Sequence, residues 1–461
     1  MTSAPTLDLS VLFKNCCSGD DAGVVAELTR LKEGAVNAAR HLPCVSDVEI
    51  ALYPEQLIAA WRRWKKLTDM GPTALLAQLL ESSRRSVPFY KNKLAEYPED
   101  LVLSLADFEP ATRQEMVRSA GQVFRDGLDP NKGQALHVTS GTTGRPLVVL
   151  IDHAMFYDMC YAVYGEAIWD TIAIPDRIAP GQTSVVLLSE HPLTWAGSAC
   201  LLPLRFSVYR RVMIDREIEK MRRAVCELAP PVLAGLPTTL VHFAEDHLAR
   251  CDVQPVMLFT SGETLFNDTR ERLARAYNCP TIDAYISSEG GAIAISRGIG
   301  EPYRVRSHAA VVEVLTPNGD LLDEGEGELV VTSLLNFSMP FIRYRSGDYG
   351  RISKVERSDG SLETVIDELW GKDLKYFDLS GLKVPTSQIG DAFRAAGLTN
   401  FTLRQTGVRA FDLRCLRNEA CLSELYQIAE RILPSASLSI EEVGRLNGPG
   451  IKTLRYSAGQ I

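Results

Sequence analysis

Apolar residues recur every three or four positions in the early part of the chain, and this spacing predicts amphipathic helices. We expect helices over residues 24–40, 56–67 and 73–94. Pro88 lies inside the third of these helices, and because proline has no N–H and disfavours helix before it, we expect an interruption or a kink there. The sequence Thr112-Arg-Gln-Glu115 has the form of a capping box and predicts the start of another helix.

From Ala135 onward, short β-branched or aliphatic runs alternate with helical stretches. The expected strands include Ser184 to Leu188, Val232 to Ala234 and Val256 to Thr260, and the expected helices are Ile218 to Leu228, Thr239 to Arg250 and Asp268 to Ala276. Such alternation indicates α/β layering with a partly parallel sheet. Between Ala309 and Arg351 the runs shorten and turn signals such as Pro317-Asn-Gly-Asp320 appear, which predicts mostly antiparallel β structure.

A polar and charged stretch, Gly371 to Gly381, precedes a new apolar pattern. A chain of 461 residues exceeds what one hydrophobic core usually supports, so at least two domains are expected. We place them at residues 1–370, in which 1–50 is an extra segment without an assigned role, and at residues 371–461. The expected fold class is therefore α/β: a large N-terminal domain with mixed sheets and an antiparallel portion, followed by a small α+β domain.

Charge and cysteine content narrow the range of functions. A net charge of −9 argues against a generic nucleic-acid or anionic membrane surface. The ten cysteines show no CxxC spacing, which suits reduced thiols in a cytoplasmic protein better than a disulfide framework or a zinc knuckle. The sequence has no apolar stretch of membrane-spanning length and no secretory pattern at its start. We therefore expect a soluble cytoplasmic protein that binds neither nucleic acid nor membrane.

A loop of small polar residues separates two apolar runs, Ala135 to Val138 and Leu147 to Ile151. The loop contains Thr139, Ser140, Gly141, Thr142, Thr143 and Gly144. Glycine permits positive φ and close backbone approach, so successive N–H groups can turn toward one anion, and the hydroxyls add further donors. The loop could thus cradle a polyphosphate, or it could be an ordinary polar hairpin. It is not a Walker A loop, because no Gly-Lys-Ser/Thr follows.

Further polar clusters each have a structural and a functional interpretation. Ser287 to Gly291 places the carboxylate of Glu289 in a loop, where most carboxylates are simply solvated. Arg343 to Asp348 is either a structural ion-pair turn or a site where arginine recognises phosphate and aspartate recognises hydroxyls. Gly371-Lys372-Asp373-Leu374-Lys375 could be a linker, and Lys452 lies in a Gly/Pro-rich stretch near the C-terminus.

The order of these clusters resembles the adenylate-forming superfamily, and most closely its phenylacetate–CoA ligase family. The similar segments are Thr139 to Pro146 (phosphate loop), Thr260 to Glu263 with Arg270 (adenine and acyl pockets), Tyr285 to Glu289 (Tyr-Gly-x-Ser/Thr-Glu), Tyr344 to Asp348 (Tyr-Arg-Thr-Gly-Asp) and Gly371 to Lys375 with Ser387-Gln-Ile389 (hinge). The resemblance runs from roughly Leu57 to the C-terminus. It implies ATP-dependent activation of a carboxylic acid, aromatic or aryl-acrylic, to an acyl-adenylate with release of pyrophosphate, and then transfer to a thiol such as coenzyme A.

The resemblance also implies residue roles. Lys452, Thr143 and Glu289 would be catalytic, Mg²⁺ would be held near Glu289, and a mobile C-terminal domain would rotate about Lys375. The implied nucleotide-binding residues are Thr139, Ser140, Gly141, Thr142, Thr143, Gly144, Ser261, Gly262, Glu263, Tyr285, Asp348 and Lys372. The implied acyl-pocket residues are His191, Trp195, Ser261, Tyr285 and Gly290.

Several positions depart from the family pattern. Ile286 stands in place of a glycine, Lys372 in place of an arginine, Gly390 in place of a glutamate, and Ile451 is inserted before Lys452. Glu190 to Trp195, where the family usually has a Gly-rich aromatic stretch, is also unusual. Other acceptors therefore stay open, namely a carrier-protein thiol, an amine or another small nucleophile. A non-catalytic relative that binds nucleotide or acyl ligand is a further alternative, and the family resemblance is compatible with a homodimer.

Overall fold

The computed structural model of the chain describes residues 54–128, 134–138, 147–169, 185–189, 218–247, 253–373, 375–398, 400–417, 420–444, 446 and 454–458, with short segments at 7–8, 26, 45–47, 177–178 and 209–213. The helix expected over residues 24–40 lies, apart from residue 26, outside the described residues. In the part of the chain that is described, no helix is both long enough and apolar enough to cross a membrane.

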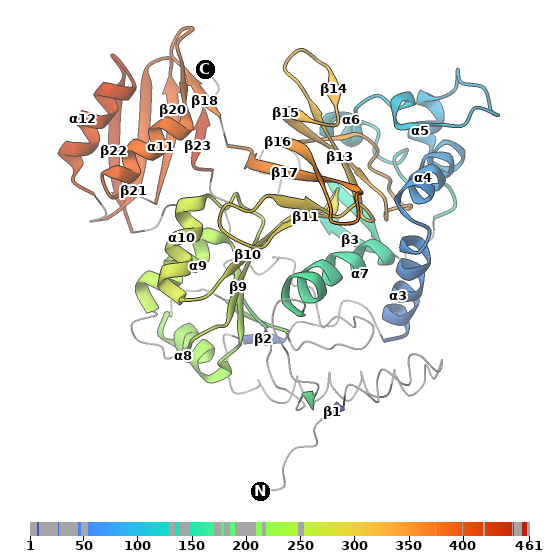
Figure 1. Ribbon diagram of the computed structural model, residues 1–461, viewed down its shortest axis with the longest axis horizontal. Coiled ribbons are helices and arrows are strands. Elements are labelled where there is room, and N and C mark those ends of the chain that lie inside the picture. The colour runs from blue at the N-terminus through green and yellow to red at the C-terminus, as the bar shows by residue number, and fades with distance from the viewer. Residues whose placement is uncertain are drawn as a thin grey trace, which may run out of the picture.

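One large sheet organises the N-terminal part of the chain (Figure 1). Within the described residues its strands lie in the order β14-β13-β15-β16-β17-β12-β11-β10-β9-β8-β6-β7-β2. In chain order they are β2 (Val45–Asp47), β6 (Val185–Ser189), β7 (Tyr209–Met213), β8 (Val232–Gly235), β9 (Met257–Ser261), β10 (Thr281–Ser287), β11 (Gly291–Ser296), β12 (Tyr303–Val305), β13 (Ala310–Leu315), β14 (Leu321–Leu322), β15 (Gly325–Ser333), β16 (Tyr344–Glu356) and β17 (Leu362–Gly371). From β7 to β10 neighbouring strands are parallel, and from β10 to β14 they are antiparallel. The predicted sheet, partly parallel and then antiparallel, is confirmed.

Helices cover both faces of the parallel strands. The expected helices appear as α8 (Ile218–Leu228), α9 (Pro237–His247) and α10 (Asn267–Tyr277) on one face, and α7 (His153–Tyr161) with the π-helical η2 (Ala162–Trp169) packs on the other. Successive residues of β8 alternate between the faces: Leu233 packs with α8 to α10, whereas Val232 and Ala234 pack with α7. Burial on both faces explains the continuous apolar runs of these strands.

The N-terminal helices fix the segment that leads into β16. The predicted break at Pro88 is confirmed, because α4 (Pro72–Ser86) ends and α5 (Pro88–Lys93) begins there; α3 (Pro54–Thr68) precedes them. The buried Tyr90 hydroxyl donates to Pro340 O at 3.0 Å and accepts from the Ile342 N–H at 3.1 Å. These two bonds hold the chain just before Tyr344.

The predicted capping box is also confirmed. Thr112 caps α6 (Arg113–Arg118): its hydroxyl accepts from the Glu115 N–H at 3.2 Å, and the Glu115 carboxylate accepts from the Thr112 N–H at 2.7 Å. The remaining short elements of this part are β1 (Leu7–Asp8), which pairs with β5 (Arg177–Ile178), the hairpin of β3 (Gln134–Val138) and β4 (Val148–Asp152), and η1 (Leu105–Asp107).

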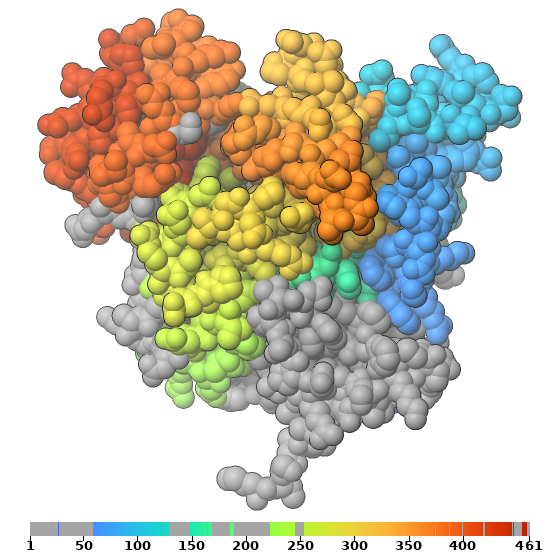
Figure 2. All heavy atoms as spheres, in the orientation of Figure 1, coloured from blue at the N-terminus to red at the C-terminus, as the bar shows by residue number. Residues whose placement is uncertain are grey.

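After β17 the described residues form a unit with its own sheets and core, which we call the C-terminal lobe. It contains β18 (Tyr376–Asp378), β19 (Lys383–Pro385), α11 (Thr386–Ala395), β20 (Phe401–Gly407), β21 (Ala410–Leu416), α12 (Leu422–Ile432), β22 (Ser437–Val443) and β23 (Tyr456–Ala458). A four-stranded sheet in the order β22-β21-β20-β23 packs on α11 and α12 around buried phenylalanines. Figure 2 shows the lobe, orange to red, resting on the yellow-green part of the chain. We propose on this basis that the domain boundary lies near residues 370–371.

The cysteines differ in one respect from the expectation. Cys160, Cys279, Cys415 and Cys421 are free thiols, as expected for a reduced protein. Cys226 on α8, however, is disulfide-bonded. Sequence spacing did not indicate this bond, because a disulfide depends on which thiols the fold brings together.

Candidate functional site

The carboxyl ends of the parallel strands meet at one edge of the large sheet, which we call the carboxyl edge. Ser261, Gly262 and Glu263 end or follow β9, and Tyr285 lies near the end of the adjacent β10. In the parallel register Ser261 is opposite Ala284, the residue before Tyr285. The two sequence segments are therefore neighbours in space, at the place where open α/β sheets bind ligands.

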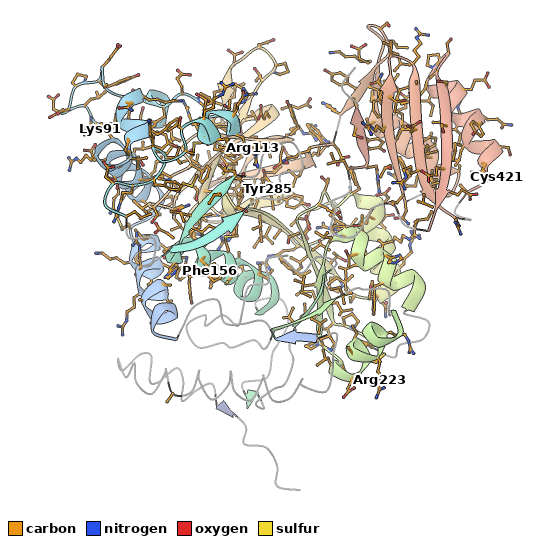
Figure 3. All side chains as sticks on the ribbon, turned by 180° about the vertical axis from the view of Figure 1, so that it is seen from behind. Lys91, Arg113, Phe156, Arg223, Tyr285 and Cys421 are labelled. Atoms are coloured by element: carbon orange, nitrogen blue, oxygen red, sulfur yellow. The ribbon has the colours of Figure 1, made fainter. Side chains whose placement is uncertain are left out.

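Glu289 lies in the turn between β10 and β11 and is held from two distant segments. Its Oε1 is 3.3 Å from Arg113 Nη1 on α6 and accepts from the Tyr344 hydroxyl at 3.2 Å. The glutamate side chain is 12% exposed. Burial and the Glu289 charge raise the pKa of Tyr344 far above its usual range, so this phenol stays a donor. Figure 3 labels Arg113 and Tyr285, which reach this central region from α6 and β10.

Asp348 is oriented by Tyr285. The buried Tyr285 hydroxyl donates to Asp348 Oδ2 at 2.8 Å, and burial together with the Asp348 charge raises the pKa of Tyr285 well above its usual value. Gly347, with φ of +74°, lies in β16 just before Asp348, where the register against β15 shifts, and a Cβ placed there would lie 4.0 Å from Lys372 Cε. Lys372 therefore lies beside the part of β16 that carries Asp348, as required if both contact one nucleotide.

The two guanidiniums of the cluster at residues 343–348 are paired with carboxylates. Arg343 binds both oxygens of Glu313, at 3.0 and 2.7 Å, and Arg345 Nε donates to Glu328 at 2.9 Å. Glu328 also accepts from the Gly347 N–H at 3.2 Å. For the arginines this geometry favours the structural interpretation, with ion pairs that hold Asp348 in place; the segment belongs to β16 rather than to a turn.

Glu263 and Gly290 have local structural contacts at the same edge. Glu263 accepts from the Thr238 hydroxyl at 2.7 Å and from its N–H at 3.3 Å, which places the carboxylate at the start of α9 where the helix dipole favours negative charge. The Gly290 N–H donates to Ser287 Oγ at 2.8 Å and closes the turn that carries Glu289.

Part of the predicted site lies outside the described residues. This holds for the phosphate-loop residues Thr139, Ser140, Gly141, Thr142, Thr143 and Gly144, for His191 and Trp195, and for Lys452. The loop's flanks are described: β3 and β4 pair antiparallel, with Val138 opposite Val148. The two ends of the candidate phosphate loop are therefore adjacent, as both the hairpin and the phosphate-loop interpretations require.

A magnesium site at Glu289 fits the donor chemistry. Among the described residues no group of three His, Cys, Asp or Glu side chains could hold a metal by itself. Mg²⁺ usually binds one or two carboxylates and takes its other ligands from water and substrate phosphates. Glu289 uses Oε1 for both of its protein contacts given above, and a carboxylate has a second oxygen to offer.

Sequence reasoning did not assign two of these contacts. In the sequence, Arg113 belongs only to a capping box, and Tyr344 only begins the segment that resembles Tyr-Arg-Thr-Gly-Asp. Neither residue lies near Glu289 in the sequence, being 176 and 55 positions away. No local signal could have indicated that both hold the same carboxylate oxygen.

Asp373, between Lys372 and the predicted hinge Lys375, is a buried carboxyl. Its Oδ1 accepts from the Tyr456 N–H at 2.6 Å, while Oδ2 is buried with no hydrogen-bond partner among the described residues. Burial raises the pKa of Asp373 from 3.8 to about 7. The folded protein thus holds a proton that the unfolded chain loses, so the stability from this group is fully present below about pH 4 and is lost as the pH rises through about 7.

We therefore expect Asp373→Asn to stabilise the protein near pH 8, by on the order of a few kcal/mol, and to change stability near pH 4 by less than about 1 kcal/mol. The amide keeps an oxygen for the Tyr456 N–H and removes the buried charge. Urea unfolding at the two pH values measures the difference. Asp412→Asn, at an exposed position of the same lobe, is the control. If the free energy of unfolding of Asp373→Asn depends on pH as in the wild type, another group is responsible for that dependence.

Comparison with known proteins shows which family model and which sequences match this chain. A family model described as AMP-binding enzyme matches residues 58–338, more than half of the chain. Protein CapK of Staphylococcus aureus is 25% identical over 217 residues, 46% of each chain. Phenylacetate-coenzyme A ligase of Pseudomonas putida is 25% identical over 293 residues, 59% of this chain and 64% of the ligase. The chain therefore spans about half to two thirds of the length of these curated relatives.

The fold agrees with a solved structure over most of its length. A crystal structure of 2-hydroxyisobutyryl-CoA ligase, in the postadenylation state with 2-HIB-AMP, superimposes with a TM-score of 0.67. The two sequences are 18% identical, and the alignment covers 90% of this chain and 94% of the ligase. The likeness shows a common fold and confirms the predicted fold class.

Proposed function

Because the chain belongs to the AMP-binding enzyme family, we propose that it activates a carboxylic acid with ATP, releases pyrophosphate and passes the acyl group to a thiol. One observation carries the proposal. The hydrogen bond from Tyr285 to Asp348 and the Glu289 cluster with Arg113 and Tyr344 lie together at the carboxyl edge. This arrangement offers a carboxylate for ribose hydroxyls and a second carboxylate for a phosphate-bound cation.

Nucleotide binding is divided among several groups. Asp348, held by Tyr285, would accept hydrogen bonds from the ribose hydroxyls, and Lys372 beside it would contribute positive charge. Residues Thr139 to Gly144 would donate N–H and hydroxyl groups to the β- and γ-phosphates. Mg²⁺, held by Glu289, would neutralise charge on the phosphate oxygens.

In the first step the substrate carboxylate attacks the α-phosphorus, the bond to pyrophosphate breaks, and negative charge moves onto the leaving group. Lys452 would contact both the carboxylate and the α-phosphate, where that charge develops. In the second step the acceptor thiol attacks the acyl carbon and AMP leaves. The rotation about Lys375 would exchange the groups facing the substrate between these steps.

The proposed substrate is based on the family resemblance, and the proposed acceptor on the names of two relatives. We propose an aromatic or aryl-acrylic acid, bound along Tyr285, Ser261 and Gly290 with His191 and Trp195 completing the pocket. Coenzyme A is the proposed acceptor, since two of the relatives above are named as coenzyme A ligases. A carrier-protein thiol, an amine or another small nucleophile is the alternative acceptor.

ATP–pyrophosphate exchange over a panel of aryl, aryl-acrylic and short aliphatic acids, with Mg²⁺ present, tests the function. We expect exchange with one acid class and, after coenzyme A is added, the matching thioester by mass spectrometry. Pyrophosphate exchange without thioester formation would support adenylation and indicate that the acceptor is not coenzyme A. ATP binding without exchange for any acid would contradict catalysis and favour a non-catalytic nucleotide-binding relative.

A further inference from the structure

The C-terminal lobe contacts α10 through a buried ion pair that lies outside the candidate nucleotide site. Arg455 Nη1 is 2.7 Å from Asp268 Oδ2, and Arg455 Nη2 donates to Thr269 Oγ1 at 3.0 Å. The side chains of the pair are 8% and 3% exposed. The guanidinium carbon also lies 4.1 Å from the ring centroid of Phe266 and 5.2 Å from that of Phe401.

The two partners reach this contact from different parts of the fold. Asp268 belongs to the first turn of α10 and accepts from the Thr269 N–H at 2.6 Å, so the N-terminal part of the chain holds its carboxylate. Arg455 directly precedes β23, and its carbonyl accepts from the Leu403 N–H of β20 at 2.7 Å. Rotation of the lobe would separate the two charges, so the pair belongs to one arrangement of the lobe.

The position of the pair indicates which step that arrangement serves. Arg455 follows Lys452 by three residues, a length of chain that spans at most about 10 Å. Asp268 follows Glu263 by five residues, on the connection that leaves the carboxyl edge at β9. The ion pair therefore anchors the chain three residues after Lys452 to the first turn of α10, the helix that follows the carboxyl edge at β9.

We infer that Asp268 and Arg455 are positioning residues that hold the C-terminal lobe, and with it Lys452, in the arrangement that forms the acyl-adenylate; this rests on the proposed function. The ion pair exists only while the lobe is docked on α10, and removing the Asp268 charge would leave the Arg455 charge buried and uncompensated in that arrangement. The contact thus favours the first step, and the lobe must give it up before the second.

The test separates the two half-reactions in Asp268→Asn. This variant keeps the side-chain shape and the acceptor for the Thr269 N–H, and it removes the charge. We expect acid-dependent ATP–pyrophosphate exchange to fall about ten-fold or more. Thioester formation from chemically prepared acyl-adenylate should stay constant or rise. The midpoint of thermal unfolding should change little, because the undocked lobe returns Arg455 to solvent. Arg455→Lys, which keeps the charge but not the planar fork, should retain more exchange than Arg455→Met.

Arg394→Gln is the matched control. Arg394 Nε lies 3.7 Å from the same Asp268 oxygen, but its side chain is 43% exposed, so solvent screens the pair and we expect less than about a two-fold change. Equal losses in both half-reactions of Asp268→Asn, or undiminished exchange, would overturn the inference.

Amide hydrogen exchange, measured by mass spectrometry, tests the docking contact without requiring enzyme activity. If the wild type exchanges pyrophosphate with no acid, the proposed function fails, yet the docking contact can still be judged. Faster amide exchange in the first turn of α10 and near Arg455 in Asp268→Asn would support the contact as the anchor of the lobe. Unaltered protection of both segments would overturn it.

Discussion

Replacement of Lys452 by alanine should lower acid-dependent ATP–pyrophosphate exchange by about 10²–10³-fold, with little change in ATP affinity. The physical reason is the position at which this ammonium would act, between the substrate carboxylate and the α-phosphate. Loss of a contact that strengthens as charge develops lowers kcat, whereas loss of a contact equally strong in the ground state raises KM. Exchange rates at saturating ATP and acid, together with ATP binding by calorimetry, separate the two effects.

A second lysine of the same lobe provides the control for this experiment. Lys383 Nζ lies 4.4 Å from the ring centroid of Tyr376, and the residue is exposed. Lys383→Ala removes the same charge from the lobe and should leave exchange within about two-fold, because an exposed cation–π contact contributes little. Comparable losses in both variants would show that the lost positive charge, and not a contact at the reacting centre, explains the effect of Lys452→Ala. A loss confined to ATP affinity would remove Lys452 from the reacting centre.

The sequence predicted most of the fold because local patterns determine it. β8 and β9 are buried on both faces and therefore read as continuous apolar runs, while the helices between them show amphipathic spacing. The proline at Pro88 and the capping box at Thr112 each act within one turn of helix, and both predictions are confirmed. The order of strands across the sheet was not readable in this way, because it depends on pairing between distant segments.

The candidate site was predictable only in part, for the same reason. Tyr285 and Glu289 come from one short segment, so their proximity follows from the sequence. The hydrogen bond from Tyr285 to Asp348 joins residues 63 positions apart, and the family resemblance implied only that both residues bind the nucleotide. Asp268 and Arg455 are 187 positions apart in the sequence, and the family resemblance assigned no role to either residue. Contacts of this kind are set by how the lobe docks on α10.

Lys375→Pro should leave pyrophosphate exchange nearly intact and lower thioester formation by roughly a hundred-fold. Proline fixes φ near −65°, so a hinge at this residue could no longer rotate freely. A shift of the two arrangements from comparable populations to about 99:1 lowers the population of the minor arrangement about fifty-fold, and a stronger bias gives the roughly hundred-fold loss in the step that needs it. The second step is followed from prepared acyl-adenylate and coenzyme A, so that adenylation does not limit it.

The side chain of Lys375 must be separated from its backbone. Lys375 Nζ pairs with Glu326 and lies 4.7 Å from the ring centroid of Trp370, both half-exposed contacts that contribute little to the free energy of docking. Lys375→Ala removes them and leaves the backbone free, so it should preserve both steps. If alanine and proline reduce thioester formation equally, the side chain rather than the hinge is responsible.

Lys375→Pro and Asp268→Asn together test whether one rigid motion couples the two steps. The proline restricts departure from the arrangement in which Arg455 meets Asp268, and so it should reduce the second step. The asparagine weakens that same arrangement and should reduce the first. The two residues are more than a hundred positions apart, so losses in different steps would be coupled only through one shared equilibrium of the lobe. In that case the double variant should show more pyrophosphate exchange than Asp268→Asn alone. Independent, additive losses would instead place the two residues in separate events.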